Sequence, residues 1–400
     1  MLNGDEHMKG KTRQRESNME LLRILAMFFI IMFHIVFLAV YPQLNDNGHF
    51  PDGVAYFDAA QFNKKLLIPA LIMPLGNVGN DIFLLISGYF MAVRFDNKKE
   101  NGGQRNGFLK YKTPVNILQI AEKLLLSLAF ATVLLVVGST LVWKATNGWC
   151  HYLLEVGQFN EMAWYIGYYF AVILLGALFL NYFLTALTYR QYKVFLIILL
   201  ALTQFTFTAG ILDTVTSGRT LCMGVLLYSL GGFVRKYDPF EKIRCYVLIL
   251  IMMSILVLTA LSYYNYTMTR LSEYIQAGST DPFLPMFPMY LYSSIVPFLV
   301  ALCLFELFRR IHIGTNRIIN FVGASTFMTY LVHNNDCFNT VWGYYNWAGE
   351  LYDQPIIFIG HLCVCTILTF VVGIMAYALY CILERTVRYC CLRSTLERGK

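Results

Sequence analysis

The sequence predicts an all-α integral membrane protein with about ten transmembrane helices and with both termini in the cytoplasm. Two properties of its composition favour this fold class: 57% of its 400 residues are hydrophobic, and 14% are charged. An average soluble domain carries roughly 25% charged residues. The third observation is a series of long apolar runs, separated by connections in which Lys and Arg are alternately abundant and scarce. Together these features indicate a multi-pass membrane protein.

Each predicted span is an apolar run long enough to cross the hydrocarbon core of a bilayer as a helix. In chain order, the spans are residues 19–41, 76–94, 115–142, 163–184, 193–211, 219–235, 244–263, 288–308, 318–341 and 355–384. The first run is too long for a signal peptide and has no small-residue cleavage site after it, so we expect it to remain as a helix. The predicted organisation is a cytoplasmic tail over 1–18, a ten-helix domain over 19–384 and a cytoplasmic basic tail over 385–400.

The positive charges predict the orientation of these spans. With both termini inside, 24 of the 31 Lys and Arg residues fall in cytoplasmic segments. The outer connections then hold five, namely Lys64, Lys65, Lys144, Arg219 and Arg270. Such a bias sets membrane orientation. It also accounts for the net charge of +7 without a nucleic-acid partner. We therefore expect a multi-pass protein of the cell membrane, with the lipid bilayer as its surroundings.

Two polar residues share one face of the first predicted helix. Arg23 and His34 are eleven positions apart. This is close to three helical turns, so both side chains point the same way, about 16 Å apart along the axis. Ionisable residues inside membrane spans are costly to keep there and are candidates for function. Alternatively, Arg23 extends to the cytoplasmic headgroups with Glu20 as its i,i+3 partner, and His34 is a satisfied structural histidine.

Further polar and aromatic residues are predicted at the depth of His34, in the outer half of the membrane. They are Asp81 on the second span, Trp164 and Tyr165 at the start of the fourth, and His333 with Asn334 near the end of the ninth. Each has a structural alternative. Asp81 could cap the start of a helix, His333 could mark a polar kink that lines a cavity, and the two aromatic residues could belong to an interfacial belt.

In order along the chain, these segments resemble the motifs of the acyltransferase-3 family of integral membrane acyltransferases, typified by bacterial polysaccharide O-acetyltransferases. The first helix is similar to the family's pattern of an Arg, ten residues and a His. The other similar segments are Gly79–Phe90 with its Ser87-Gly88 pair, Trp164-Tyr165, and Gly323–His333. Taken alone, Ser87-Gly88 indicates close helix packing rather than a nucleophile. The resemblance covers nearly the whole chain.

The resemblance implies a membrane-embedded O-acyltransferase with cytoplasmic acetyl-CoA, or another acyl-CoA, as donor co-substrate. The acceptor would be a hydroxyl group of a lipid-linked saccharide or of a cell-surface glycan. The phosphates of the donor need cations. The candidates at the cytoplasmic mouth are Arg23, Arg94, Lys98, Lys99, Lys110 and Lys112. This assignment predicts a role in polysaccharide O-acetylation, as in exopolysaccharide biosynthesis.

Within this interpretation, His34 is the expected general base, because a neutral imidazole can accept the proton of an attacking alcohol near neutral pH. Asp81 or His333 is expected to orient it. A covalent acyl-histidine relay is a second possible route. The residues expected to contact the acceptor are Trp164, Tyr165 and Asn334.

A transporter or flippase for a sugar-containing or small solute is the competing interpretation, since many helices with polar residues in the membrane also fit that class. Two observations count against it: the two halves of the chain do not match each other, and few acidic residues lie at mid-depth to couple ions. The scattered cysteines contain no C-x-x-C pair, so we expect no metal site. Cys381, Cys390 and Cys391 fall near the cytoplasmic end, which argues against a disulfide framework. A homo-oligomer is compatible with the sequence.

Overall fold

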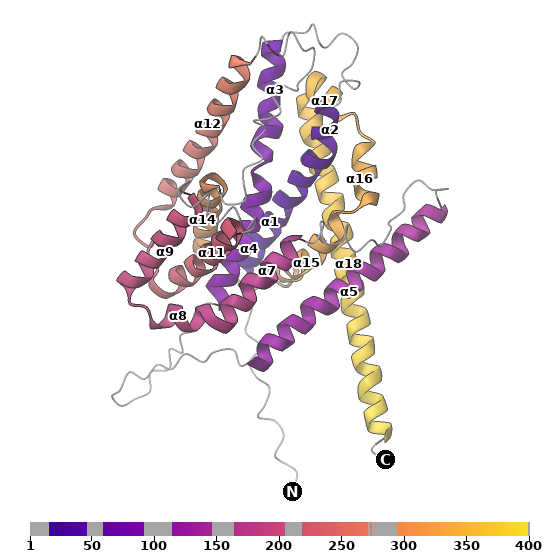
Figure 1. Cartoon of the computed structure of the whole chain (residues 1–400). Coiled ribbons are helices and arrows are strands. Elements are labelled where there is room, and N and C mark those ends of the chain that lie inside the picture. The colour runs from indigo at the N-terminus through magenta and orange to yellow at the C-terminus, as the bar shows by residue number, and fades with distance from the viewer. Residues whose placement is uncertain are drawn as a thin grey trace.

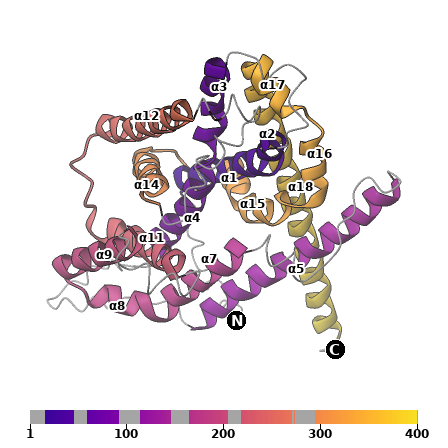
Figure 2. The same ribbon diagram turned by 45° about the horizontal axis from the view of Figure 1, so that its top comes forward.

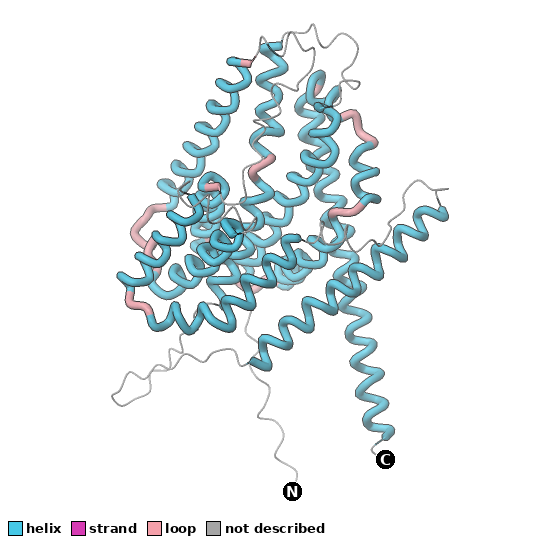
Figure 3. Tube along the Cα trace, in the orientation of Figure 1, coloured by secondary structure: helices cyan, strands magenta, loops and turns pink. Residues whose placement is uncertain are grey.

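The fold is entirely helical in the part of the chain that the structure describes. This computed structural model describes residues 16–45, 59–91, 114–145, 164–204, 218–270, 273 and 294–398. These ranges contain helices and short connections but no strand (Figure 3). The helices are α1 (Ser17–Ile35), the π-helix η1 (Val36–Val40), α2 (Tyr41–Asn45), α3 (Ala59–Ile72), α4 (Leu75–Met91), α5 (Pro114–Ala145), α7 (Trp164–Leu175), the π-helix η3 (Gly176–Leu180), α8 (Asn181–Ala186), α9 (Tyr189–Gln204), α11 (Gly218–Tyr237), α12 (Cys245–Thr269), α14 (Ile295–Arg310), α15 (Arg317–His333), α16 (Asp336–Gly343), α17 (Trp347–Asp353) and α18 (Pro355–Arg398). The all-α prediction is therefore confirmed.

Six helical segments in the described ranges are long and apolar enough to cross a membrane. They are Ser17–Leu44, Lys64–Met91, Ala121–Leu141, Trp164–Ala186, Cys245–Thr269 and Pro355–Val387. The other four predicted spans coincide with α9, α11, α14 and α15, which are helical but shorter or more polar. Ten spans and the cytoplasmic position of the termini thus stay predictions.

The helix boundaries depart from the predicted spans at three places. A turn at Met73 and Pro74 separates α3 from α4, and proline lacks the amide that continues a helix. The second candidate span, Lys64–Met91, runs across this turn, so it begins well before the predicted residue 76 and includes part of the expected outer connection. The predicted ninth span divides after His333, because the Asn335 side chain accepts hydrogen bonds from two amides at the start of α16. Finally, α18 continues to Arg398, so most of the predicted basic tail is helical.

Helix α1 lies at the centre of the molecule and joins two hydrophobic clusters. In Figure 2 the other helices surround it. Residues of its first half belong to one cluster with residues of α4, α7, α9, α11 and α14. Residues of its second half belong to another with residues of α3, α15, α16, α17 and α18. The helices that α1 itself contacts most are α4, α15 and α18. The two clusters therefore follow one another along α1, which lies among the other helices (Figure 1).

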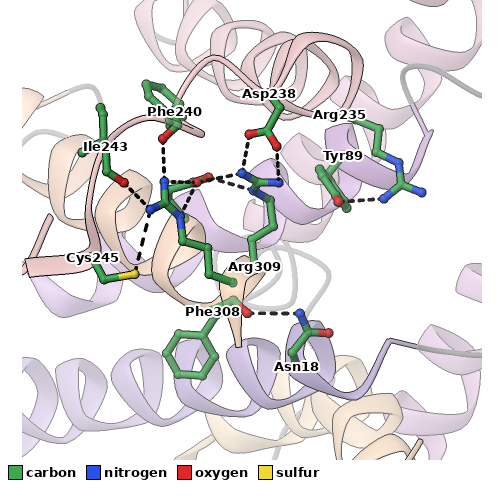
Figure 4. A network of polar contacts seen from close by, with 11 residues as sticks. Asn18, Tyr89, Arg235, Asp238, Phe240, Ile243, Cys245, Phe308 and Arg309 are labelled. Atoms are coloured by element: carbon green, nitrogen blue, oxygen red, sulfur yellow. Dashed lines mark hydrogen bonds and ion pairs between the residues drawn. The ribbon is translucent and has the colours of Figure 1, made fainter. Parts of the chain in front are cut away.

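Polar contacts connect the helix ends on one side of the molecule (Figure 4). Arg309 and Arg310, in the last turn of α14, both donate to Glu306, which is 1% exposed. Arg309 also pairs with Asp238 after α11. At the start of α1, the Asn18 amide donates to the Phe308 carbonyl at 3.1 Å. These bonds fix the start of α1 beside the ends of α11 and α14.

Candidate functional site

Two histidines that are far apart in the sequence meet between α1 and α15. His34 Nδ1 lies 3.2 Å from His333 Nε2, and the two ring centroids are 4.7 Å apart with the planes at 76°. His333 is 1% exposed, whereas His34 is partly accessible. The two histidines meet because α1 and α15 pack side by side. Both lie where an α-helix ends: His333 is the last residue of α15, and His34 is the last but one of α1, before the π-helix η1. Such π-helical segments are frequent at functional sites.

The hydrogen bonds of the pair specify where the imidazole protons lie. A carbonyl oxygen can only accept, so His333 Nδ1 donates to Tyr330 O at 2.7 Å, and His34 Nδ1 donates to Ile30 O at 2.8 Å. With both rings neutral, His333 Nε2 is then an acceptor and shares the Nδ1 proton of His34. Among the described residues, nothing is hydrogen-bonded to His34 Nε2. This nitrogen therefore keeps a free lone pair.

A cavity of about 190 Å³ extends from Arg23 to the turn of α15 just before His333. Its walls come from α1, α4, α5, α7 and α15. The residues that line it are Arg23, Phe83, Ser87, Leu124, Tyr165, Ile166, Tyr169, Gly323, Ala324, Thr326, Phe327 and Tyr330. Neither histidine lines the cavity: it ends at Tyr330, whose ring contacts the His333 ring with centroids 5.2 Å apart.

Arg23 contributes the positive charge at one end of this cavity. Its guanidinium Nη1 donates to Glu20 Oε1 at 2.9 Å, and the side chains of Arg23 and Glu20 are 26% and 6% exposed. The i,i+3 partnership expected under the headgroup alternative is therefore present. The side chain also lines the cavity, which an arginine extended only to headgroups would not do.

Tyrosines and a serine form the polar part of the cavity wall. Ser87 Oγ lies 2.8 Å from the Tyr169 hydroxyl, and the Tyr165 hydroxyl donates to Asn80 O at 2.8 Å. The Tyr165 ring packs against Tyr330 with centroids 5.4 Å apart. Tyr165 is therefore a buried residue of the cavity wall.

Other residues expected at the site lie elsewhere. Trp164 does not line this cavity. It is 47% exposed, as expected of an interfacial residue. Asp81 is fully buried, and among the described residues neither carboxylate oxygen has a hydrogen-bond partner. It lies inside α4, which begins at Leu75, so the alternative of a helix cap is wrong. No described contact joins Asp81 to His34, whereas His333 Nε2 lies within hydrogen-bond distance of His34 Nδ1.

Two groups of predicted residues add nothing to the described site. Asn334 follows the last residue of α15 and is partly exposed, with no hydrogen bond to a described residue. The predicted donor-binding cations of the basic connection lie outside the described residues; they are Arg94, Lys98, Lys99, Lys110 and Lys112.

Sequence reasoning missed Ser87 and Tyr169. In the Ser87-Gly88 pair, the predicted close packing belongs to Gly88, whose added Cβ would lie 1.9 Å from Tyr228 O. Ser87 points instead to Tyr169 and the cavity. One signal was available, because Tyr169 is four residues after Tyr165 and such pairs share a helix face.

Comparison with known protein families gives one match. The model of a family described as an acyltransferase domain matches residues 16–378. No curated protein and no solved structure matches the chain.

Proposed function

This chain belongs to the acyltransferase-3 family, whose model covers residues 16–378, and on that premise we propose that it is a membrane-embedded O-acyltransferase. It moves an acyl group, acetyl in the simplest case, from cytoplasmic acyl-CoA to a hydroxyl of a lipid-linked or cell-surface glycan. His34 is the general base. The observation that supports the proposal is the His34–His333 pair, with a free Nε2 on His34, one aromatic ring beyond the end of a cavity that begins at Arg23.

The donor is proposed to enter through the cavity. Arg23 would bind a phosphate of acyl-CoA, since a guanidinium matches phosphate oxygens in charge and geometry. The slender pantetheine arm would follow the cavity past Ser87 and Tyr169 to Tyr330. Arg23 and His34 are eleven residues apart on one helix, about 16 Å along the axis. An extended arm spans such a distance while the nucleotide stays at the cytoplasmic mouth.

The chemistry follows from the protonation of the histidine pair. His34 Nε2 accepts the proton of the acceptor hydroxyl as the oxygen attacks the thioester carbonyl carbon. A C–O bond forms, the C–S bond breaks, and the proton passes from Nε2 to the departing thiolate. Products are an ester and free CoA thiol. His333 Nε2 accepts a hydrogen bond from His34 Nδ1–H. This bond leaves the lone pair on Nε2 of His34 and stabilises the imidazolium that forms transiently on His34.

Replacing His34 tests this function. In membranes supplied with radiolabelled acetyl-CoA and the cell's own glycan, His34→Gln should lower acetyl transfer by about a hundredfold or more, because general bases contribute that much to rate. His312→Gln is the matched control, since that histidine is exposed in the connection between α14 and α15. Protein level and thermal unfolding of both variants are measured alongside.

Full acetyl transfer by a normally folded His34→Gln protein would remove His34 from the chemistry. A wild-type protein that moves a labelled solute across vesicles without any transfer would contradict the enzyme itself and support the transporter interpretation.

A further inference from the structure

Tyr330 forms the end of the cavity that lies nearest to the histidine pair. It is 9% exposed, and its ring contacts the rings of Tyr165 and His333 with centroids 5.4 Å and 5.2 Å away. Helical side chains lean toward the N-terminus of their helix, which in α15 is the direction of Thr326, another residue of the cavity wall. This direction places the Tyr330 hydroxyl on the cavity side of the ring.

The other hydroxyl groups in the cavity wall already donate their protons within the protein. Ser87 and Thr326 donate to backbone carbonyls of their own helices at 2.7 Å and 2.8 Å. Because the Ser87 proton is used in this way, the Tyr169 hydroxyl, 2.8 Å away, donates to Ser87 Oγ. The Tyr165 hydroxyl donates to a backbone carbonyl of α4 at 2.8 Å. None of these four groups has a proton left for a substrate.

The Tyr330 hydroxyl differs from these four groups, because no residue that the structure describes is hydrogen-bonded to it. Buried hydroxyl groups normally have a partner, since an unpaired polar group costs free energy. Among the described side chains that line the cavity, Arg23 offers the other available donor, and it lies at the opposite end. A ligand at the histidine end of the cavity therefore meets one free side-chain donor, the phenolic O–H of Tyr330.

The proposed transfer needs a hydrogen-bond donor that neither histidine supplies. As an alcohol attacks a thioester, negative charge develops on the carbonyl oxygen, and a donor fixed beside that oxygen lowers the barrier. The Nδ1 proton of His34 is shared between Ile30 O and His333, and its Nε2 is the proposed proton acceptor. The Nδ1 proton of His333 is donated to Tyr330 O. The donor must therefore come from another residue.

Tyr330 and His34 are close enough to act on one thioester from two sides. The His333 ring contacts both, with its centroid 5.2 Å from that of Tyr330 and 4.7 Å from that of His34, so the Tyr330 and His34 rings are no further apart than the sum of these distances. Two hydrogen bonds of about 2.8 Å, one to the carbonyl oxygen and one from the alcohol to Nε2, span such a gap together with the reacting atoms.

We propose that Tyr330 is a catalytic residue of the acyl transfer, whose hydroxyl donates a hydrogen bond to the thioester carbonyl oxygen and stabilises the negative charge that develops there. The proposal rests on the proposed function. The phenolic proton stays on Tyr330 throughout. The C–O bond forms, the C–S bond breaks as the carbonyl is restored, and the departing thiolate takes the proton from His34 Nε2.

Tyr330→Phe removes the donor and keeps the ring. In the purified full-length protein, kcat for acetyl transfer from acetyl-CoA should fall about a hundredfold, as for the loss of one oxyanion donor. The KM for acetyl-CoA should stay near the wild-type value, because the hydrogen bond is strongest in the transition state. The unfolding temperature should also stay unchanged, since the hydroxyl has no hydrogen bond to a described residue.

Tyr192→Phe is the matched control. Tyr192 is fully buried on α9 in the cluster away from the histidines, and its hydroxyl donates to Ser229 O at 2.8 Å. This variant should unfold at a lower temperature, because it loses a buried hydrogen bond, and should keep the wild-type kcat. A wild-type kcat in Tyr330→Phe, or a loss confined to the KM for acetyl-CoA, would overturn the proposal.

Infrared spectroscopy of the bound donor tests the contact without turnover. The probe is acetyl-CoA with a heavy carbon isotope at the carbonyl, and the difference from unlabelled donor isolates the carbonyl stretch. In His34→Gln, which should hold the donor unreacted, this stretch should lie at a lower frequency than in His34→Gln/Tyr330→Phe, because a hydrogen bond weakens the C=O bond. Equal frequencies in the two proteins would overturn the assignment of Tyr330.

The two measurements separate this proposal from the proposed function. A wild type that neither binds acetyl-CoA nor transfers an acetyl group contradicts both. A wild type that binds acetyl-CoA without any transfer contradicts the proposed function. A wild type that transfers the acetyl group, with equal carbonyl frequencies in the two variants, contradicts the role of Tyr330 alone.

Discussion

Arg23 has two roles that a single substitution cannot separate. Its guanidinium pairs with Glu20, whose side chain is 6% exposed, and it also lines the cavity. Removing the arginine alone breaks a partly buried ion pair at a buried carboxylate, and breaking a buried pair typically costs about 3–5 kcal/mol of folding stability. Loss of activity in Arg23→Ala could therefore come from misfolding.

A double variant separates donor binding from ion pairing. In Glu20→Gln/Arg23→Gln neither side chain is charged, so no buried carboxylate is left unpaired. We expect this protein to fold and to show a KM for acetyl-CoA raised about tenfold, since a charge-assisted phosphate contact is worth about 1.5–3 kcal/mol. Glu20→Gln alone keeps the guanidinium and is the control, with a nearly unchanged KM. Equal KM values in all three proteins would assign Arg23 to the ion pair only.

Sequence reasoning could place single residues on helix faces, but it could not pair residues from distant helices. The spacing of Arg23 and His34 follows from helical periodicity alone. The contact between His34 and His333 joins residues 299 positions apart and depends on how α1 and α15 pack. The same limit explains why Asp81 and His333 were equal candidates for the orienting residue.

Among the described elements, α4 and α11 approach each other closely at two glycines. A Cβ on Gly88 would lie 1.9 Å from Tyr228 O, and a Cβ on Gly231 would lie 2.2 Å from Leu85 O. Neither obstacle is the end of a flexible side chain, so even one methyl group must separate the two backbones. Glycine at both positions is what lets α4 approach α11 and hold Ser87 toward the cavity.

Gly88→Ala should therefore destabilise the protein by about 1–3 kcal/mol or more, the usual cost of overpacking a close contact. Thermal unfolding of the detergent-solubilised protein would measure the loss. Gly167→Ala is the matched control on α7, because a Cβ there meets nothing within 4 Å and alanine is a better helix former than glycine. Similar unfolding temperatures for Gly88→Ala and wild type would mean that the two helices are less tightly packed than in this structure.

Helices were predictable as elements, and their ends were not. Hydropathy located a helix at each predicted span for which the structure describes residues, because apolar runs of that length signal helices in lipid. It missed α3, whose first residues include Gln61, Lys64 and Lys65 among apolar ones. The predicted ninth span also continued beyond His333, because the chain stays largely apolar where the Asn335 side chain caps the start of a new helix.

At the scale of the whole molecule, the two ends of the bundle differ in chemistry. The end formed by the start of α1 and the ends of α11 and α14 carries the network of Arg309, Arg310 and Glu306. The opposite end carries α2, α16 and α17, where Cys337 is disulfide-bonded. Disulfides persist on the oxidising side of a membrane, whereas the positive-inside rule places clustered arginines in the cytoplasm. Both criteria favour the predicted orientation.

Cysteine labelling in intact cells tests this orientation and, with it, the route of the donor. Cys390 is exposed near the end of α18, and Tyr344 is 85% exposed at the opposite end. In a background without the other free cysteines, a membrane-impermeant maleimide should label Tyr344→Cys in intact cells. It should label Cys390 only after the cells are permeabilised. The reverse pattern would put Arg23 and the mouth of the cavity outside the cell. Acyl-CoA is made inside, so a cavity opening outward could not receive it, and the proposed path from Arg23 to His34 would have to be abandoned.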